Sequence, residues 1–229
     1  MKAPSSSRLV RWWRVARGRW LLARGVRPAS RRFGYDRGTP VHRHYLQQFL
    51  SAEADRIRGR CLEFHAPDYV PGYGGSRVTS LDILDVPPGS PRATLVADLT
   101  RPNALPAARF DCIVCTHVLH LVYEADAVVA ELHRLLAPGG SLLVAVPGTQ
   151  MRDFDWTEFR MFTALGLGRM LSGPFPEGAV RVRAYGNSLA AAAELRGLAA
   201  EDLRGSELAV SDPLFEVEVC AVATREPAV

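Results

Sequence analysis

The feature that most constrains the fold is a repeated alternation of short apolar segments with helical segments. Apolar segments lie at residues 61–64, 78–84, 93–99, 110–115 and 141–147. Between the last two, residues 127–140 have a helical pattern that stops at Pro138-Gly139-Gly140, a strong helix terminator. Continuously apolar strands separated by helices are typical of a parallel sheet covered on both faces. The pattern therefore predicts an α/β fold with a doubly wound, mostly parallel sheet.

The flanking segments extend this pattern in both directions. Thr39 and Pro40 can cap and start a helix with apolar residues at helical spacing. After residue 150 we expect one or two helices over 151–171, a strand over 179–186, an alanine-rich helix over 188–203 and a final strand over 215–225. A final strand that follows a helix can add antiparallel at a sheet edge. The prediction is a seven-stranded sheet.

The charge of the chain is unevenly distributed. The net charge is +4, yet ten basic residues precede the first acidic residue, Asp36, and the remainder is net negative. Three tryptophans lie among these arginines, so we divide the 229 residues into a basic amphipathic or disordered extension, 1–33, and one domain, 34–229. The extension could bind an anionic membrane surface or nucleic acid, or could be solvated or packed on its own domain.

The cysteines and the hydropathy indicate a cytoplasmic protein without a bound metal. No apolar run is long enough to span a membrane, and arginines interrupt the first 33 residues too often for a secretory signal. The four cysteines are scattered and are expected to be reduced core residues. Cys112, Cys115, His117 and His120 have a spacing that suggests zinc. However, residues three apart on a strand point to opposite faces, so we expect no metal site.

Two blocks resemble a known family. FDCIVCTHVLH (residues 110–120) followed by ELHRLLAPGGSLLVAVP (131–147) resembles the fourth strand, next helix and fifth strand of class I S-adenosylmethionine-dependent methyltransferases. The resemblance extends over roughly residues 58–225. DRGTP and AYGN also resemble a bacterial branch that modifies sugars or natural products. The resemblance implies a Rossmann-like fold, S-adenosylmethionine as cofactor and methyl transfer as activity.

The resemblance also implies where the cofactor binds. Glu63 matches the acidic residue that ends the first strand, before a glycine-rich turn that approaches the amino-acid part of the cofactor. Here His65 begins the stretch HAPDY and the GxGxG pattern is absent. Either this loop binds the cofactor along a different backbone path, or binding has been lost.

Two further acidic positions match the family. Asp82 matches the residue that ends the second strand and accepts both ribose hydroxyls, with Asp85 as a rival that could instead cap the following turn. Asp98 and Leu99 match the position that contacts adenine. With Glu63, these residues place acids at the carboxyl ends of three consecutive strands, where open α/β sheets bind ligands.

The catalytic candidates follow the fourth strand. His117 or His120 could be the general base that a hydroxyl acceptor requires, or both could simply bond to neighbouring backbone. Thr116 could line the cofactor site, and Arg37 and Tyr45 could contact the cofactor carboxylate or the acceptor. The aromatic segment that contains Trp156, Phe159 and Phe162, with Arg160, is either an acceptor lid or part of a packed helix.

These observations favour one function over two alternatives. The first is O-methylation of a small-molecule or sugar hydroxyl, with S-adenosylmethionine as cofactor and a small molecule or glycan as acceptor. The second is a catalytically inactive methyltransferase-like domain that binds a partner. The third is an RNA methyltransferase recruited through the basic extension.

Overall fold

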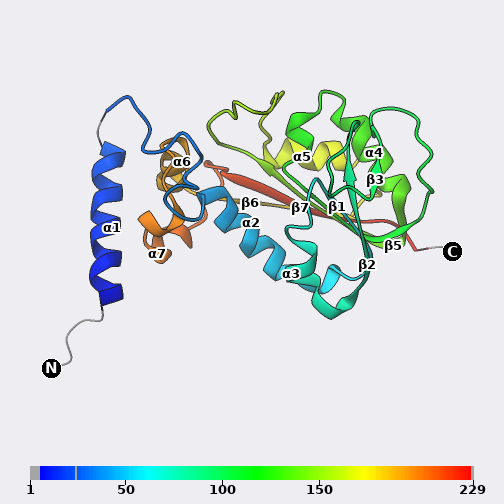
Figure 1. Cartoon of the computed structure of the whole chain (residues 1–229), viewed down its shortest axis with the longest axis horizontal. Coiled ribbons are helices and arrows are strands. Elements are labelled where there is room, and N and C mark those ends of the chain that lie inside the picture. The colour runs from blue at the N-terminus through cyan, green and yellow to red at the C-terminus, as the bar shows by residue number, and fades with distance from the viewer. Residues whose placement is uncertain (1–5, 24, 228–229) are drawn as a thin grey trace.

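One seven-stranded sheet runs through the molecule (Figure 1). The computed structural model describes residues 6–23 and 25–227. The strands are β1 (Gly59–Phe64), β2 (Val78–Asp85), β3 (Leu95–Val96), β4 (Phe110–Thr116), β5 (Leu136–Pro147), β6 (Val180–Tyr185) and β7 (Glu218–Thr224). Their order is β3-β2-β1-β4-β5-β7-β6.

The strand directions confirm a mostly parallel sheet. The pairs β2–β3, β1–β2, β1–β4 and β4–β5 are parallel, and β7 pairs antiparallel with both β5 and β6. The predicted antiparallel final strand is thus present, and it lies one position in from the edge, because β6 forms the edge beyond it. Since strand order reverses between β1 and β4, the carboxyl ends of these two strands flank the point where open α/β sheets bind ligands.

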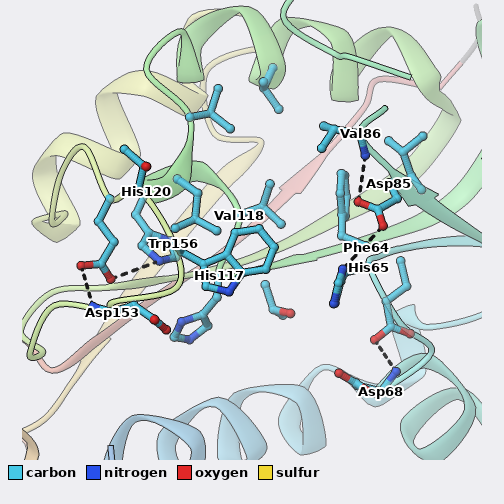
Figure 2. Close-up of a pocket in the computed structure, with 18 of the residues that line it drawn as sticks. Phe64, His65, Asp68, Asp85, Val86, His117, Val118, His120, Asp153 and Trp156 are labelled. Atoms are coloured by element: carbon cyan, nitrogen blue, oxygen red, sulfur yellow. Dashed lines mark hydrogen bonds and ion pairs between the residues drawn. The ribbon is translucent and has the colours of Figure 1, made fainter. Parts of the chain in front are cut away.

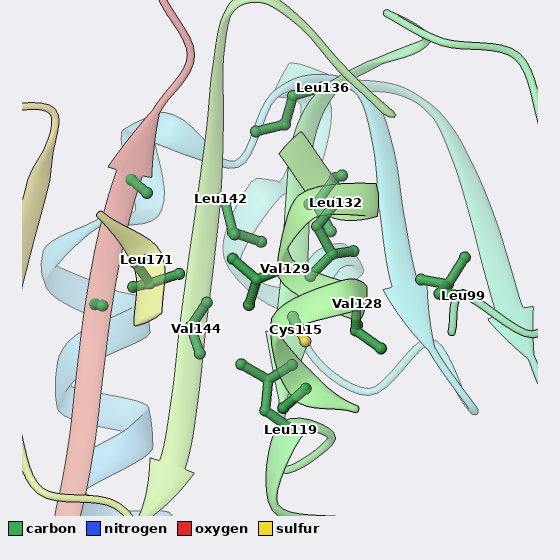
Figure 3. Packing of buried hydrophobic residues seen from close by; sticks show 14 of the residues in the cluster. Leu99, Cys115, Leu119, Val128, Val129, Leu132, Leu136, Leu142, Val144 and Leu171 are labelled. Carbon is green, nitrogen blue, oxygen red and sulfur yellow. The ribbon is translucent and has the colours of Figure 1, made fainter. Parts of the chain in front are cut away.

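Helices cover both faces of the sheet. On one face α4 (Ala125–Leu135) and α5 (Ala164–Leu171) pack against the strands through a buried apolar cluster (Figure 3). On the other face the helices are α2 (Val41–Ala52), α3 (Val70–Gly74) and α6 (Ser188–Leu195). Both clusters draw on alternate residues of the same strands, which explains why the strands are continuously apolar.

Several elements differ in length from the sequence prediction. β3 pairs with β2 over two residues only, and it is flanked by backbone bonds from Thr94 to Ile83 and from Ala97 to Asp85. Residues 148–163 are irregular, and of the predicted helices only α5 forms. The alanine-rich helix ends at Leu195, since Gly197 has a φ of 64° and turns the chain out of the helix. The short helices η1 (Ala54–Arg56), η2 (Gly75–Arg77), η3 (Leu119–Leu121), η4 (Ala200–Asp202) and α7 (Gly205–Leu208) connect the main elements.

The basic extension contains helix α1 (Ser6–Ala23), which lies against η4 at one end of the molecule (Figure 1). Its inner side includes buried Val15 and Gly18. A Cβ atom added at Gly18 would lie only 2.7 Å from the carbonyl oxygen of Asp202, so the helix approaches η4 closely at this glycine. Arg19 pairs with Glu207 at 2.5 Å. The outermost residues of the extension, 1–5, and residue 24 lie outside the described part. The helix is therefore attached to the domain rather than separate from it.

The cysteine prediction is consistent with the structure. All four cysteines are buried and unpaired. Cys112 packs in the α2 face and Cys115 in the α4 face, so they point to opposite sides of β4 as expected. Among the described residues no His, Cys, Asp and Glu side chains cluster to hold a metal ion, and no helix is long and apolar enough to cross a membrane.

Candidate functional site

A cavity of about 650 Å³ lies at the carboxyl ends of β1, β2 and β4. Its volume is within the usual range of small-molecule sites. Figure 2 shows its wall, with His65 and Asp85 on one side, His117 and His120 on the other, and Trp156 between them. The cavity brings together most of the predicted site residues: Glu63, His65, Asp98, Leu99, Thr116, His117 and His120.

Glu63 organises the loop that follows β1. Its carboxylate is buried and accepts backbone N–H bonds from Asp68 (3.0 Å), Tyr69 (2.7 Å) and Val70 (3.0 Å). Burial raises the pKa of Glu63, and the three backbone hydrogen bonds lower it. Burial has the larger effect, so the pKa is about 7. Glu63 therefore shapes the loop from inside, and the loop backbone forms one side of the cavity.

His65 directly follows β1, at the position where the sequence resemblance implies a glycine turn. Its φ is 65°, in the left-handed region that glycine adopts without strain. Its ring packs edge-on against that of Trp156, with the two ring centroids 5.8 Å apart. Its Nδ1 lies 3.6 Å from the carboxylate of Asp85. The loop thus makes the backbone turn without a glycine.

Strained backbone is concentrated around this cavity. Among the described residues, four that are not glycine have positive φ: Phe33, His65, Ala108 and His117. All but Ala108 line the cavity. Such conformations cost about 1–3 kcal/mol each and persist at functional sites, where the surrounding structure enforces them.

The acidic residue of β2 that lines the cavity is Asp85 rather than Asp82. The strand continues three residues beyond Asp82, and Asp85 ends it. Asp82 lies outside the cavity, where it pairs with Arg109 at 2.6 Å and accepts a bond from Thr94 at 2.9 Å. The expectation that Asp82 stands at the strand end is therefore corrected, and Asp85 takes that place.

Asp98 and Leu99 lie on the wall beside Asp85. Asp98 accepts bonds from the Thr100 hydroxyl and backbone N–H, which hold the pKa of its carboxyl below the usual value. Leu99 is buried and offers an apolar surface. An acid next to an apolar side chain suits a flat, partly polar ring.

His117 directly follows β4, and His120 lies in η3. Nε2 of His117 lies 2.9 Å from Oε1 of Glu218, which begins β7 and is fully buried. Nε2 of His120 lies 3.9 Å from Oε1 of Glu158, and its Nδ1 is buried without a hydrogen-bond partner. Neither histidine side chain bonds to neighbouring backbone, which was the alternative interpretation of this motif.

Two predicted residues lie elsewhere. Tyr45 is buried in the core, stacked on Tyr185, and is not part of the cavity wall. Arg37 bonds to Asp202 at 2.8 Å, also away from the cavity. Both belong to the segment before β1, and their side chains face other parts of the domain rather than the cavity in which we expected them.

The same segment contributes residues that the sequence did not identify as ligand contacts. Phe33, Tyr35, His42 and Arg43 line the cavity, and Arg43 bonds to the hydroxyls of Tyr35 and Tyr69. Burial lowers the pKa of Arg43, but the nearby tyrosines and Glu218 raise it by more, so its charge is held at the wall. One local signal was available: Thr39 and Pro40 predict the start of a helix, which puts His42 and Arg43 in the first turn of α2.

The aromatic segment after β5 forms another part of the wall. Gln150, Asp153, Asp155, Trp156, Thr157 and Glu158 line the cavity. Phe159 donates its backbone N–H to the carbonyl of His120 at 2.8 Å, which ties this segment to η3. Phe162 is buried in the core. The segment therefore both covers the cavity and packs into the domain.

Residues 70–144, from α3 into β5, match a family model described as a methyltransferase domain. A search of curated proteins found no significant match.

Solved structures share the fold at low identity. The [4+2]-cyclase SpnF is 16% identical with a TM-score of 0.52, covering 100% of this chain and 99% of that one. A Burkholderia thailandensis 1,6-didemethyltoxoflavin-N1-methyltransferase is 14% identical with a TM-score of 0.50, covering 99% and 93%. The CMeT domain of citrinin polyketide synthase is 14% identical with a TM-score of 0.52, covering 82% of this chain and 54% of that one. Residues 70–144 therefore match a methyltransferase domain, and the chain shares the Rossmann-like fold of these solved structures, as the resemblance implied.

Proposed function

We propose that the protein is an S-adenosylmethionine-dependent methyltransferase whose acceptor is a hydroxyl of a small molecule or glycan. The main observation behind this proposal is that one cavity is lined by three groups of residues: the loop around Glu63, the acids Asp85 and Asp98, and the histidines His117 and His120. The methyltransferase-domain match across α3 to β5 supports the same activity.

The residues present fit the cofactor. Asp85, at the end of β2, would accept the ribose hydroxyls, and Asp98 with Leu99 would hold the adenine amino group and ring. The loop over Glu63 and His65 would face the amino-acid part. When bound, the cofactor supplies a methyl group on a sulfonium, so the protein mainly has to align the acceptor with it.

A small-molecule acceptor is supported by the size of the cavity and by one neighbour. About 650 Å³ suits a cofactor and a compact second ligand rather than a polymer. The Burkholderia thailandensis structure contains both 1,6-didemethyltoxoflavin and S-adenosylhomocysteine. The histidines provide the base that a hydroxyl, unlike a neutral amine, needs for efficient attack.

The first test is cofactor binding. Calorimetry and thermal unfolding of the full chain with S-adenosylmethionine and S-adenosylhomocysteine should give saturable heat and a higher Tm. Absence of both effects contradicts the proposal. Release of S-adenosylhomocysteine with a panel of hydroxylated compounds then identifies the acceptor.

The alternative of an inactive binding domain is favoured by one observation, the replacement of the glycine turn by His65. The fold alone does not decide between an active methyltransferase and an inactive binding domain, since SpnF, which has a similar fold, is described as a cyclase. An inactive domain would bind neither cofactor form, whereas a methyltransferase with a rebuilt loop binds both.

For the basic extension we propose an anionic lipid surface as partner. Trp13, Arg17 and Trp20 recur at helical spacing on α1, and both tryptophans are more than half exposed. The inner side of the helix is already packed on η4. Aromatic and arginine side chains on one free helix face are typical of helices that lie in the membrane interface.

Vesicle sedimentation tests this partner. We expect binding to vesicles that contain phosphatidylglycerol but not to pure phosphatidylcholine, weakened roughly tenfold or more by W13A/W20A. L165A/L214A removes two apolar side chains of comparable exposure elsewhere and should bind as wild type does. Equal binding to both vesicle types contradicts the proposal, as does salt-dependent RNA binding without vesicle binding.

A further inference from the structure

Among the described residues, Arg43 is the one arginine or lysine that lines the cavity. It lies in the first turn of α2, and its side chain is partly exposed. Several carboxylates share the cavity wall, yet within the described part of the chain none of them forms an ion pair with Arg43. Its positive charge therefore has no carboxylate in direct contact.

Two tyrosines hold the guanidinium in place. Nε of Arg43 donates to the hydroxyl of Tyr35 at 3.0 Å, and Nη1 donates to the hydroxyl of Tyr69. The guanidinium carbon lies 5.9 Å from the centroid of the Tyr69 ring. Tyr35 precedes α2, and Tyr69 lies in the loop whose backbone Glu63 holds. Three segments that are separate in sequence thus meet at one cation, whose orientation is fixed.

The guanidinium keeps donors for a ligand. It carries more N–H groups than the two hydroxyls accept. Nη2 of Arg43 forms no hydrogen bond with the described residues, and the buried side-chain atoms that lack a partner belong to other residues, so Nη2 is not enclosed either. Because Arg43 lines the cavity, a ligand there can reach these donors.

The charge of Arg43 is maintained at this position. Burial lowers its pKa, but Tyr69, Tyr35 and Glu218 raise the pKa by more. Glu218 attracts the guanidinium from a distance, since its own close contact is with Nε2 of His117 at 2.9 Å. A partly buried cation without a contacting carboxylate is stabilised by an anion that binds next to it.

The tyrosine hydroxyls can add donors to the same ligand. A hydroxyl that accepts a hydrogen bond still has its own O–H to donate. Neither Tyr35 nor Tyr69 donates its O–H to another residue in the described part of the structure. Burial raises the pKa of Tyr69 to about 12, although Arg43 lowers it, so this hydroxyl keeps its proton at neutral pH.

We propose that Arg43, Tyr35 and Tyr69 form a binding site for an oxyanion, a carboxylate or a phosphate, of a ligand in this cavity. The planar N–H fork of arginine matches both groups, and hydroxyl donors complete such a site. The inference rests on the proposed methyl transfer. Arg43 binds and orients a ligand and takes no part in proton transfer.

Two ligands of the proposed reaction can supply the oxyanion. The amino-acid part of the cofactor ends in a carboxylate, and Tyr69 belongs to the loop that we propose faces this part. An acidic group on the acceptor is the second source, because Arg43 also acts on the histidines. Burial lowers the pKa of His117 and His120, and the charge of Arg43 lowers both further.

Calorimetry of the full chain with two probes tests the cofactor as the source. S-adenosylhomocysteine has the carboxylate, and decarboxylated S-adenosylhomocysteine lacks only that group. If the cofactor supplies the oxyanion, R43M should weaken binding of the first roughly 10- to 100-fold and change the Kd of the second by less than about threefold. Y69F, which removes one hydroxyl, should weaken S-adenosylhomocysteine roughly 3- to 10-fold.

Thermal unfolding with inorganic phosphate tests the acceptor as the source. If bound S-adenosylhomocysteine leaves the site free, phosphate should give a saturable rise in the Tm of the wild-type complex and none in R43M. R43M would then bind S-adenosylhomocysteine as tightly as the wild type does.

Two further variants control for charge and folding. R56M is the matched control, because Arg56 pairs with Glu53 at 2.9 Å outside the cavity, and it should behave as the wild type does in both assays. R43K keeps the positive charge but loses the planar fork, so it should show the same selectivity with a smaller loss. It decides the result if R43M does not fold by circular dichroism.

The outcomes separate this site from the proposed function. The site is overturned if the Arg43 variants bind both adenosine probes unchanged, or weaken both equally, and phosphate gives no rise in Tm that depends on Arg43. If the wild type does not bind S-adenosylhomocysteine, the proposed methyl transfer is contradicted, and phosphate titration of the free chain then decides. A saturable rise in Tm that R43M lacks would keep the oxyanion site, and its absence would overturn it.

Discussion

Nδ1 of His65, in the loop that follows β1, lies 3.6 Å from the carboxylate of Asp85 at the end of β2. Both side chains line the cavity (Figure 2). The contact links the loop that follows β1 to the acid that we propose for the cofactor ribose.

Replacing Asp85 should weaken cofactor binding. In D85A the ribose hydroxyls would lose a charged acceptor, a loss of about 1.5–3 kcal/mol, or roughly 10- to 150-fold in Kd for S-adenosylhomocysteine by calorimetry. D82A is the matched control, because Asp82 bonds to Arg109 and Thr94 outside the cavity. A larger loss of affinity in D82A than in D85A would show that Asp82, and not Asp85, binds the ribose.

The backbone of His65 predicts a difference between two small substitutions. At a φ of 65° alanine is strained and glycine is not. Both H65A and H65G lose the contacts to Asp85 and Trp156, so H65G should be more stable than H65A by about 1 kcal/mol. Urea unfolding of the two variants measures this, and a more stable H65A would show that the loop is not strained.

The sheet was predictable because its signals are local. Apolar runs identify β1, β2, β4 and β5. Pro138-Gly139-Gly140 predicted the end of the helix before β5, but α4 already ends at Leu135, and these three residues lie in the first part of β5, where its register with β4 shifts. Asp82 and Asp85 could not be separated in this way. They lie an odd number of residues apart on one strand, so they point to opposite faces, and a strand end three residues later changes which one meets the ligand.

The partners of the histidines were not predictable. Glu218 approaches His117 because antiparallel β7 inserts beside β5, and Glu194 approaches His42 because α6 packs on α2. Both contacts join residues about a hundred or more positions apart, and no periodicity within a segment reports them. The left-handed backbone of His65 and His117 was equally hidden, because neither is a glycine.

Removing the carboxylate of Glu63 should release the β1 loop. E63A leaves three backbone N–H groups, that of Val70 buried, without their acceptor, which should lower the free energy of unfolding by about 2–3 kcal/mol and abolish stabilisation by S-adenosylhomocysteine. E131A, which removes a carboxylate paired with Arg134 near the surface, should cost less than about 1 kcal/mol and leave ligand binding intact. Equal effects of the two variants on ligand binding would show that Glu63 does not organise the site.

The buried ring of His120 should make the protein less stable in acid. Its pKa falls from 6.5 in the unfolded chain to about 4 in the fold, so between these values the unfolded state binds the proton and the folded state does not. Stability is therefore lost as pH falls from about 6.5 toward 4, by up to about 3 kcal/mol at 1.36 kcal/mol per pKa unit. Glu63 has the opposite sign, because its raised pKa makes stability fall as pH rises from about 4.5 through 7, so each group has to be isolated by its own variant. Urea unfolding from pH 7 to 4 should show a shallower loss in H120N than in the wild type, and parallel curves would mean that His120 is protonated in the folded protein.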